Sequence, residues 1–273
     1  MQVSIVGERA EAAQILARAV AAAGPAILEV YAAGPAQATA KGDGSPVTEA
    51  DLRAQAKIFA VLEREMPGIH VVSEEDEGER APFDPDQPFL LVDPLDGTRE
   101  FIARNGEFTV NVALIENRVP VAGAVFAPAI GKLWVGGAGA WMAEGLTGAA
   151  PPPRESWRPI RTRAAPARLV ALASRSHGDA KTEAFLAALP IGERRSAGSS
   201  LKFCLVAEGL ADVYPRFGPT MEWDTAAGHA VLAAAGGAVL AEDGSPHRYG
   251  KLESGLLNGS FIAWGDLQAR GGR

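Results

Sequence analysis

Cysteine is almost absent from this 273-residue chain, and several other features that would assign a protein class are also missing. The single cysteine, Cys204, excludes an internal disulfide, and its apolar surroundings predict a buried thiol. The net charge of −7 gives no basic footprint, so a nucleic-acid polymer is not an expected partner. No apolar segment approaches the roughly 20 residues of a membrane span, and no secretory leader is recognisable. We therefore expect a cytoplasmic protein, and peripheral contact with the inner membrane face and a homodimer stay open.

The composition, with 47% hydrophobic and 22% charged residues, is typical of a globular protein large enough for one large domain or two ordinary ones. Residues 1–150 predict an α+β domain, with helices over 8–33 and from Thr48 to about Met66, then several strands and a hairpin that turns at Asn117-Arg118. Three consecutive prolines at 151–153 mark the boundary, because proline neither donates to a ladder nor continues a helix. Residues 158–273 then alternate strands and helices, which predicts an α/β domain.

The stretch FLLVDPLDGTREF, residues 89–101, carries the strongest chemical signal. An apolar run typical of a buried strand ends at Asp93, and a second acid, Asp96, follows three residues later. Two carboxylates this close repel each other unless a nearby positive charge balances them or one of them stays protonated. Because such a local violation tends to mark a functional site, we expect this strand end to carry function.

Three further acids lie where one predicted element gives way to the next: Asp51, Glu74 and Asp224. Each also has a structural explanation. Thr48 and Asp51 resemble a capping box, Asp224 fits the N-cap of a helix from Thr225 to Ala235, and Glu74 lies in an acidic run that solvent could account for. Taken singly, these three acids are weak evidence for a functional site. Together with the acid pair of DPLDGT, they become candidates for one shared site.

A hard divalent cation resolves the repulsion. Mg²⁺ takes oxygen ligands in near-octahedral geometry and prefers to share substrate phosphate oxygens. If the five acids converge, two or three divalent ions would balance their charge, and the Leu95 carbonyl is a candidate for an additional ligand, since a tight turn can point it inward. Gly97 allows close approach of the backbone to a phosphate, and the Thr98 hydroxyl can hold a water. This set of residues suits metal-assisted hydrolysis of a phosphate ester.

Two motifs, DPLDGT and WDTAAGHAVLAAAGG, resemble the signatures of the inositol monophosphatase superfamily of magnesium-dependent, lithium-sensitive phosphatases. DGSPVTEAD, VSEED, SRSH and GSSLKFCLVAEGLADVYPRFGPTMEWDTAAGH are similar to one branch, the bacterial 3'(2'),5'-bisphosphate nucleotidases of sulfur metabolism. The resemblance spans residues 41–264, nearly the whole chain. It implies a five-layer αβαβα sandwich.

The resemblance also implies roles for individual residues. The implied metal ligands are Glu74, Asp93, Leu95 through its carbonyl, Asp96 and Asp224. Asp51, Glu74 and Thr98 would be catalytic and prepare the attacking water. The implied substrate contacts are Leu95, Asp96, Gly97, Thr98, His177, Gly198, Lys202 and Asp224. Lys202 has a physical reason as well, because a substrate with two phosphates needs a cation away from the metals.

The reaction that the resemblance implies is hydrolysis of the 3'-phosphate of adenosine 3',5'-bisphosphate, or of its sulfated relative, with two or three Mg²⁺ ions. Attack by water would be direct, since the sequence supplies no obvious activated serine or cysteine nucleophile. Two alternatives remain. The substrate could be inositol monophosphate or a sugar bisphosphate, because specificity lies in loops. In the other, the chain would be a catalytically silent nucleotide-binding protein, although none of the site residues is missing.

Overall fold

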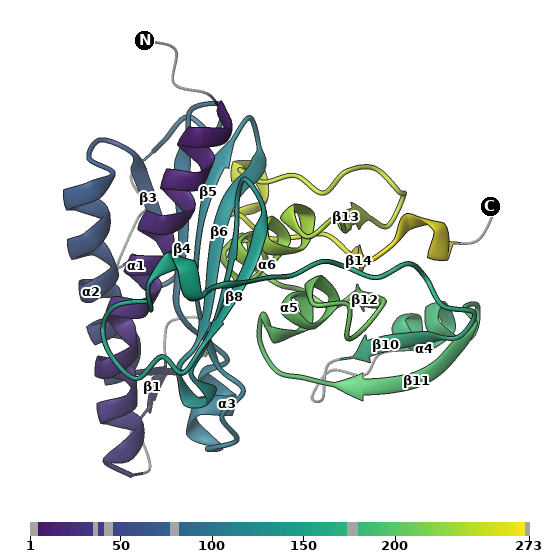
Figure 1. The fold of residues 1–273 in the computed structure, drawn as a ribbon, viewed down its shortest axis with the longest axis horizontal. Coiled ribbons are helices and arrows are strands. Elements are labelled where there is room, and N and C mark those ends of the chain that lie inside the picture. Colours follow the sequence, from purple (N-terminus) through teal and green to yellow (C-terminus); the bar gives the residue numbers. More distant parts are fainter. Residues whose placement is uncertain (1–4, 35–37, 41–45, 77–81, 174–179, 271–273) are drawn as a thin grey trace.

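The computed structural model describes residues 5–34, 38–40, 46–76, 82–173 and 180–270, and it has five layers (Figure 1). Helices α1 (Ile5–Ala32) and α2 (Glu49–Glu65) cover one face of a seven-stranded sheet. Helices α5 (Leu201–Ala207) and α6 (Glu222–Ala234) fill the space between this sheet and a five-stranded sheet. Helix α4 (Ala180–Ala187) packs on the opposite face of the second sheet. The predicted αβαβα sandwich is confirmed.

The seven-stranded sheet follows the chain, in the order β3-β4-β5-β6-β7-β8-β9. β3 pairs in parallel with β4, and the other neighbours are antiparallel. β5 and β6 form the predicted hairpin, whose turn residues Asn117 and Arg118 both have positive φ. The strands are β3 (His70–Ser73), β4 (Phe89–Asp96), β5 (Thr109–Glu116), β6 (Val119–Ala127), β7 (Lys132–Gly136), β8 (Ala140–Glu144) and β9 (Arg158–Pro159).

The five-stranded sheet has the order β11-β10-β12-β14-β13, with β10 parallel to both neighbours and β14 antiparallel to both. Its strands are β10 (Leu169–Ala173), β11 (Ile191–Ser196), β12 (Val213–Arg216), β13 (Ala238–Ala241) and β14 (Phe261–Trp264). Smaller elements are β1 (Ala38–Ala40), β2 (Pro46–Thr48), α3 (Thr98–Ile102), η1 (Pro128–Ile130), η2 (Arg154–Ser156), η3 (Leu252–Ser254) and η4 (Leu267–Arg270).

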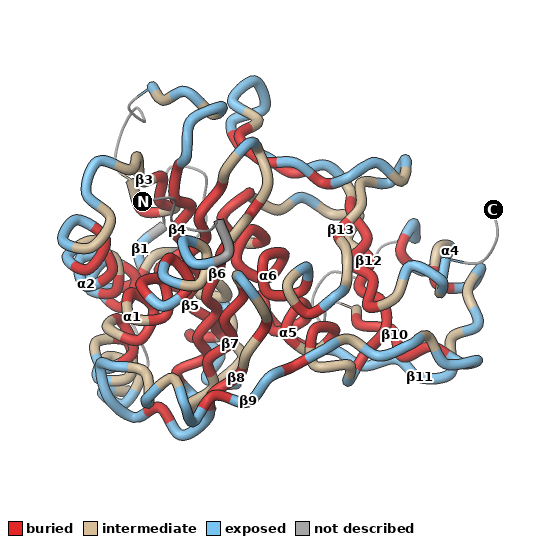
Figure 2. Tube along the Cα trace, turned by 45° about the horizontal axis from the view of Figure 1, so that its top comes forward, coloured by how far each residue is buried: buried red, intermediate tan, exposed pale blue. Residues whose placement is uncertain are grey.

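Glycines on the first sheet let α6 approach it closely. A Cβ at Gly136 would lie 2.6 Å from the Ala230 carbonyl oxygen, and a Cβ at Gly123 would lie 2.8 Å from the Ala230 methyl group. The residues of α6 and of the strands that it contacts are almost all buried (Figure 2). This packing fixes α6 against β6 and β7, and the helix also contacts β4 and β5, so its first turn lies close to the end of β4.

Several expectations need correction. Among the described residues, one helical segment, Gly7–Ala32, is long and apolar enough to cross a membrane, contrary to the expectation from the sequence. Half of it is buried against α2 and the first sheet, so it is accounted for as a core helix and lends no support to membrane contact. Helix α6 begins at Glu222 rather than Thr225, and β9 extends the first sheet past residue 150. The domain division at 150 and 158 stays a prediction.

Candidate active site

A bulge at the end of β4 explains how its two acids serve one site. Asp93 pairs with Asn111 and Asp96 with Thr109, so three steps along β4 match two along β5. In a regular strand, residues three apart point to opposite faces, and the extra residue of a bulge reverses this alternation. Pro94 favours the bulge because it has no N–H to donate to the ladder. The strand end therefore directs both carboxylates to the same side, and Asp93 is the one that lies in a closely spaced group of acids.

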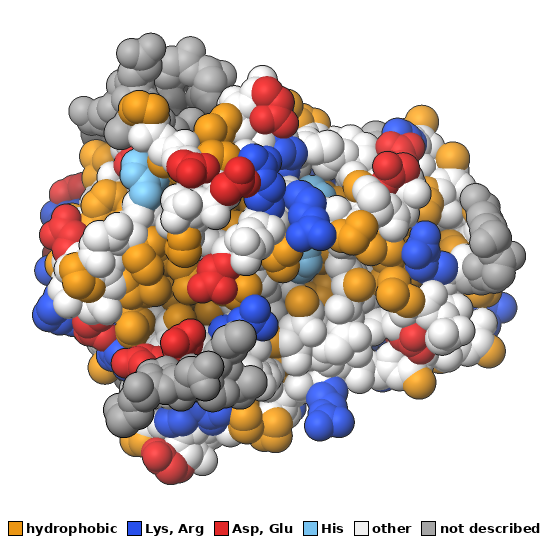
Figure 3. Space-filling model, turned by 90° about the horizontal axis from the view of Figure 1, so that it is seen from above, with side chains coloured by type: hydrophobic (Ala, Val, Ile, Leu, Met, Phe, Trp, Pro, Cys, Tyr) orange, Lys and Arg blue, Asp and Glu red, His pale blue; other side chains and the backbone are white. Residues whose placement is uncertain are grey.

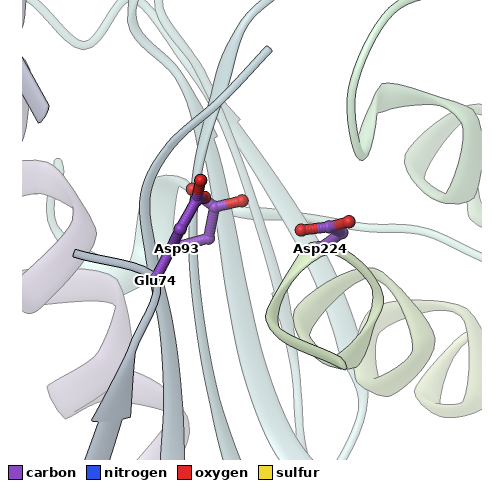
Figure 4. A group of neighbouring side chains, drawn as sticks. All are labelled: Glu74, Asp93 and Asp224. Atoms are coloured by element: carbon purple, nitrogen blue, oxygen red, sulfur yellow. The ribbon is translucent and has the colours of Figure 1, made fainter. Parts of the chain in front are cut away.

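Three acids meet at this place, one from each of three elements. Glu74 follows β3, Asp93 lies in β4, and Asp224 lies in the first turn of α6. Figure 4 shows Glu74 and Asp93 side by side at the strand ends, with Asp224 facing them from the helix. One carboxylate oxygen from each lies within 4.8 Å of the others, a spacing that a single metal ion can bridge. The structure thus brings together three of the predicted ligands, which are far apart in the sequence.

Asp93 is a buried acid whose carboxylate is incompletely hydrogen-bonded. Its side chain is fully buried, and its Oδ1 accepts a hydrogen bond from the Leu95 N–H at 3.0 Å. Its Oδ2 is buried too and has no hydrogen-bond partner among the residues that the structure describes. Burial, followed by the negative charges of Glu74 and Asp96, raises the pKa of Asp93 well above its ordinary value. A buried oxygen without a donor is what a metal ion would satisfy.

Asp96 and Asp224 share this electrostatic environment. Burial raises the pKa of Asp96 to about 6, although the positive charge of Lys202 counteracts it. Burial, then the charges of Asp96 and Glu74, raises the pKa of Asp224. Asp224 occupies the third position of α6 and accepts a hydrogen bond from the Met221 N–H at 2.8 Å, so it caps the helix from inside rather than as the N-cap residue. The helix start therefore holds this carboxylate in place.

Asp51 takes part both in the capping of helix α2 and in the candidate active site. Its Oδ2 accepts hydrogen bonds from the backbone N–H and the hydroxyl of Thr48, at 2.8 and 2.7 Å, and the bond from the N–H belongs to the capping box of α2. Its Oδ1 faces the Thr98 hydroxyl at 3.4 Å, and that hydroxyl also lies 3.4 Å from the Leu95 carbonyl oxygen. The side chain is buried, and burial raises the pKa of Asp51. One oxygen caps the helix while the other faces the Thr98 hydroxyl.

A cavity of about 150 Å³ adjoins the acids on the side of the second sheet. It is lined by Asp96, Gly97, Glu100, Ala197, Gly198, Ser199, Lys202, Phe203, Tyr214, Arg216, Pro219, Thr220, Asp224 and Thr225. Gly97, with φ of 88°, is in the left-handed region, and a Cβ there would lie 2.2 Å from the Ser199 hydroxyl oxygen. The turn after β4 therefore requires glycine for both conformation and space.

Lys202 is a buried cation in this cavity, not a solvated helix residue. It lies in the first turn of α5, is 5% exposed, and its Nζ donates to the carbonyl oxygens of Ala197 and Ser199 at 3.1 and 2.7 Å. Burial lowers the pKa of Lys202 to about 8, partly offset by the negative charge of Asp96. An ammonium group has three protons, so one remains for a ligand. Gly198, on the loop that precedes α5, lines the same cavity, whereas His177 falls outside the described residues.

Sequence reasoning left out three residues of this site. Arg216 ends β12 and lines the cavity, and its buried Nε lacks a hydrogen-bond partner within the described ranges. Ser199 and Ser200 precede α5 and contact Asp96. Their signal was the pair of serines directly before a helix, which reads equally well as ordinary capping. Arg216, in the run YPRFGP after a predicted strand, is a possible phosphate contact from its charge and position, and this signal alone did not place it in the expected set.

The comparisons with known proteins fit this geometry. The model of the inositol monophosphatase family matches residues 8–269, nearly the whole chain. The chain belongs to the inositol monophosphatase family. Members of this family are metal-dependent phosphatases, and the acidic group of this member is where such chemistry would take place. The chain is accordingly a phosphatase-type enzyme.

Individual relatives show which members of the family the chain resembles. The chain is 48% identical to the 3'(2'),5'-bisphosphate nucleotidase CysQ of Escherichia coli over 242 residues, which cover 88% of this chain and 94% of that protein. The crystal structure of CysQ from Bacteroides thetaiotaomicron is 40% identical, with a TM-score of 0.77 over 93% of this chain and 97% of that one. An inositol monophosphatase from Anabaena, 24% identical with a TM-score of 0.70 over 92% and 89% of the two chains, shares the fold.

Proposed function

We propose that the chain hydrolyses the 3'-phosphate of adenosine 3',5'-bisphosphate, giving AMP and inorganic phosphate. The observation that carries the proposal is the pairing of an acidic group with two cationic side chains, Lys202 and Arg216, in the adjoining cavity. A substrate with two phosphates would place one among metal ions at the acids and the other against the cations. The similarity to nucleotidases of this specificity supports the assignment. The sulfated relative of the substrate fits the same arrangement.

The residues that would hold Mg²⁺ are Glu74, Asp93, Asp96, Asp224 and the Leu95 carbonyl. The orphaned Oδ2 of Asp93 and the all-oxygen donor set fit this ion. With Asp51 included, the carboxylates carry five negative charges, which two or three divalent ions would balance. When bound, Mg²⁺ supplies a Lewis acid for the phosphoryl oxygens and lowers the pKa of a water.

The chain's own groups would carry out the remaining tasks. Asp51 and Thr98 would orient the attacking water, and Asp51 would accept its proton, because its Oδ1 is directed toward the hydroxyl of Thr98. The bond from phosphorus to the ribose 3'-oxygen breaks as the bond to the water oxygen forms. The leaving oxygen takes up a proton from solvent water, and Asp51 returns to solvent the proton that it accepted. Gly97 and Thr98 would contact the phosphate through their backbone N–H groups. Gly198 and Lys202, with His177, would contact the nucleotide.

The surface is compatible with a small substrate. On the face shown in Figure 3, described Lys and Arg side chains are interspersed with Asp and Glu side chains rather than forming a basic stripe. A phosphorylated small molecule is therefore the partner we propose. The cytoplasmic location and a homodimer stay predictions.

A substrate panel tests the proposed function. With Mg²⁺ present, we expect kcat/KM for adenosine 3',5'-bisphosphate to exceed that for inositol 1-phosphate by about 100-fold, since charge-assisted contacts to a second phosphate contribute roughly 1.5–3 kcal/mol each. Fructose 1,6-bisphosphate also carries a second phosphate, so slower turnover of it than of the nucleotide tests whether the cations require the spacing of the two phosphates on the nucleotide. Without Mg²⁺ we expect turnover of none of them. Preference for inositol 1-phosphate would replace the proposal with an inositol monophosphatase, and binding of the nucleotide without turnover would indicate a silent binding protein.

Replacing Arg216 with alanine tests the second phosphate site. We expect KM for adenosine 3',5'-bisphosphate to rise about 10- to 100-fold, because a charge-assisted hydrogen bond to that phosphate is lost. The slow hydrolysis of a single-phosphate substrate should be unaffected. Arg168→Ala is a suitable control, since Arg168 is exposed and donates to the Ile191 carbonyl at 3.2 Å, away from the cavity. An equal loss on both substrates would show that Arg216 acts on folding instead.

A further inference from the structure

Ser200 stands at the N-cap of α5 but does not cap the helix. A serine at this position usually accepts a hydrogen bond from an N–H of the first turn. Here the side chain makes no such bond. Its hydroxyl oxygen lies 2.7 Å from the Asp224 carbonyl oxygen and 3.2 Å from Asp96 Oδ2, and the residue is 1% exposed. The hydroxyl thus forgoes an interaction that would stabilise its own helix and contacts two predicted metal-binding residues.

These two contacts join the two sheets at the active site. Asp96 ends β4 of the first sheet, Asp224 lies in α6, and Ser200 lies on the loop that leaves β11 of the second sheet. The hydroxyl has one proton, so it donates to one acceptor at a time. The Asp224 carbonyl can only accept and is the nearer of the two, which ties the first turn of α6 to this loop. Asp96 Oδ2 is the alternative acceptor of the same proton, so the hydroxyl can orient either acidic residue from one fixed position.

The neighbouring residues hold the same loop to the end of β4. The Ser199 hydroxyl lies 2.9 Å from the Asp96 carbonyl oxygen and 2.8 Å from the Glu107 carbonyl oxygen. The Gly198 N–H donates to Glu107 Oε2 at 2.8 Å. Ser199 has a φ of 48°, a left-handed conformation that a serine adopts only when its surroundings impose it. A strained and well-bonded loop is suited to holding Ser200 in a fixed position.

We infer that Ser200 is a positioning residue that fixes Asp96 and Asp224 relative to each other, so that both can bind the same set of cations. The inference rests on the proposed metal role of these two acids. Gly198 and Ser199 line the substrate cavity, whereas the Ser200 hydroxyl is directed at the two acidic residues. We therefore place its effect on metal affinity and turnover, and not on the binding of the nucleotide.

The test is Ser200→Ala, measured first without substrate. The Mg²⁺ concentration that gives half of the maximal rise in Tm should increase by about 10-fold or more, the size expected when the group that orients a ligand is removed. With adenosine 3',5'-bisphosphate at saturating Mg²⁺, kcat should fall by about 10-fold while KM stays within about 2-fold. A merely structural role would lower Tm without shifting the Mg²⁺ dependence.

Three comparison variants separate the parts of this role. Thr109→Val removes a weaker contact to Asp96 Oδ2, at 3.4 Å, and leaves Asp224 untouched, so it should shift the Mg²⁺ dependence less than Ser200→Ala. Ser245→Ala removes a hydroxyl that bonds to Asp243 on the exposed surface and should change neither quantity. Ser200→Cys keeps a weak donor of similar shape and should give an intermediate shift.

Each result of these measurements bears either on the positioning role of Ser200 or on the proposed substrate. A normal fold with unchanged Mg²⁺ dependence in Ser200→Ala would overturn the inference, as would equal shifts in Ser200→Ala and Thr109→Val. If Ser200→Ala does not fold, the Mg²⁺ dependence of Tm is measured on Ser200→Cys instead. A Mg²⁺ dependence of Ser200→Cys equal to that of the wild type would then overturn the inference. A wild type that is stabilised by Mg²⁺ but does not hydrolyse the nucleotide would defeat the proposed substrate alone, because the thermal measurement needs no substrate.

Discussion

Asp93→Asn is expected to lower kcat by about 1000-fold, since a metal ion supplies several kcal/mol of charge stabilisation and about 1.4 kcal/mol corresponds to a factor of ten. Asp93 is the predicted ligand with a buried oxygen that has no donor among the described residues, so it depends most on a cation. An amide oxygen keeps the shape but not the charge. Initial rates at saturating Mg²⁺ and substrate measure the effect. A loss smaller than about 10-fold would remove Asp93 from the set of ligands.

The same variant should stabilise the metal-free protein. Burial and the charges of Glu74 and Asp96 raise the pKa of Asp93 well above 3.8. Between 3.8 and the raised pKa, the unfolded chain releases this proton while the folded chain keeps it, so the stability of the wild type falls as pH rises. Asp93→Asn lacks this titration. Urea unfolding in a chelator should show a stability advantage of the variant that is larger at about pH 7.5 than at about pH 4.5.

Comparing the variant with the wild type matters because other groups titrate in the same range. Burial lowers the pKa of His229 to about 3 and of His247 to about 4, which makes both proteins lose stability as pH falls below 6.5. These histidines are present in both proteins, so their contribution cancels in the difference. An advantage that stays constant with pH would contradict the repulsion that we assign to Asp93.

Asp51→Asn is expected to lower kcat by about 100-fold or more, the usual contribution of a general base. KM and the free energy of unfolding should change little, because the amide oxygen can still accept the capping hydrogen bonds from Thr48. The lost charge affects the oxygen that faces Thr98. Steady-state kinetics and urea unfolding of the same preparation measure both quantities.

A matched control is available on the same turn of helix. Glu49 is also acidic, its side chain is 63% exposed, and it pairs with Arg53 on the surface. Glu49→Gln makes the same change of charge and should leave kcat unaltered. If Asp51→Asn loses stability and retains its turnover, the capping box would be the whole function of this residue.

The sequence is most informative where local rules conflict. Two acids at the end of an apolar strand violate ordinary strand composition, and this conflict by itself distinguishes Asp93 and Asp96 from the other acids of the chain. The cap at Thr48 and the turn at Asn117-Arg118 follow local rules, and the structure has both. The convergence of Glu74, Asp93 and Asp224 depends on the order of β3 and β4 and on the packing of α6, which the family resemblance implied and local pattern alone does not encode.

Other parts of the structure could not be read from local pattern. β11, with the sequence IGERRS, is an exposed and polar edge strand whose pairing with β10 defines it. Lys202 has the spacing of an ordinary helix residue, and its burial depends on carbonyl oxygens presented by the preceding loop. Ser200 has the sequence position of a helix cap, yet tertiary contacts take its hydroxyl. In each case contacts made by the tertiary fold outweigh a local preference.

The central claim is that carboxylates from two strands and a helix hold a shared cation. The most direct measurement is a crystal soaked in Mn²⁺, whose anomalous scattering locates the ion. We expect a peak about 2.0–2.2 Å from oxygens of Asp93 and Asp224, with Glu74 completing the site, at the ligand distances of a small octahedral cation. Fully occupied Mn²⁺ elsewhere in the crystal, with no peak among these three acids, would contradict the account.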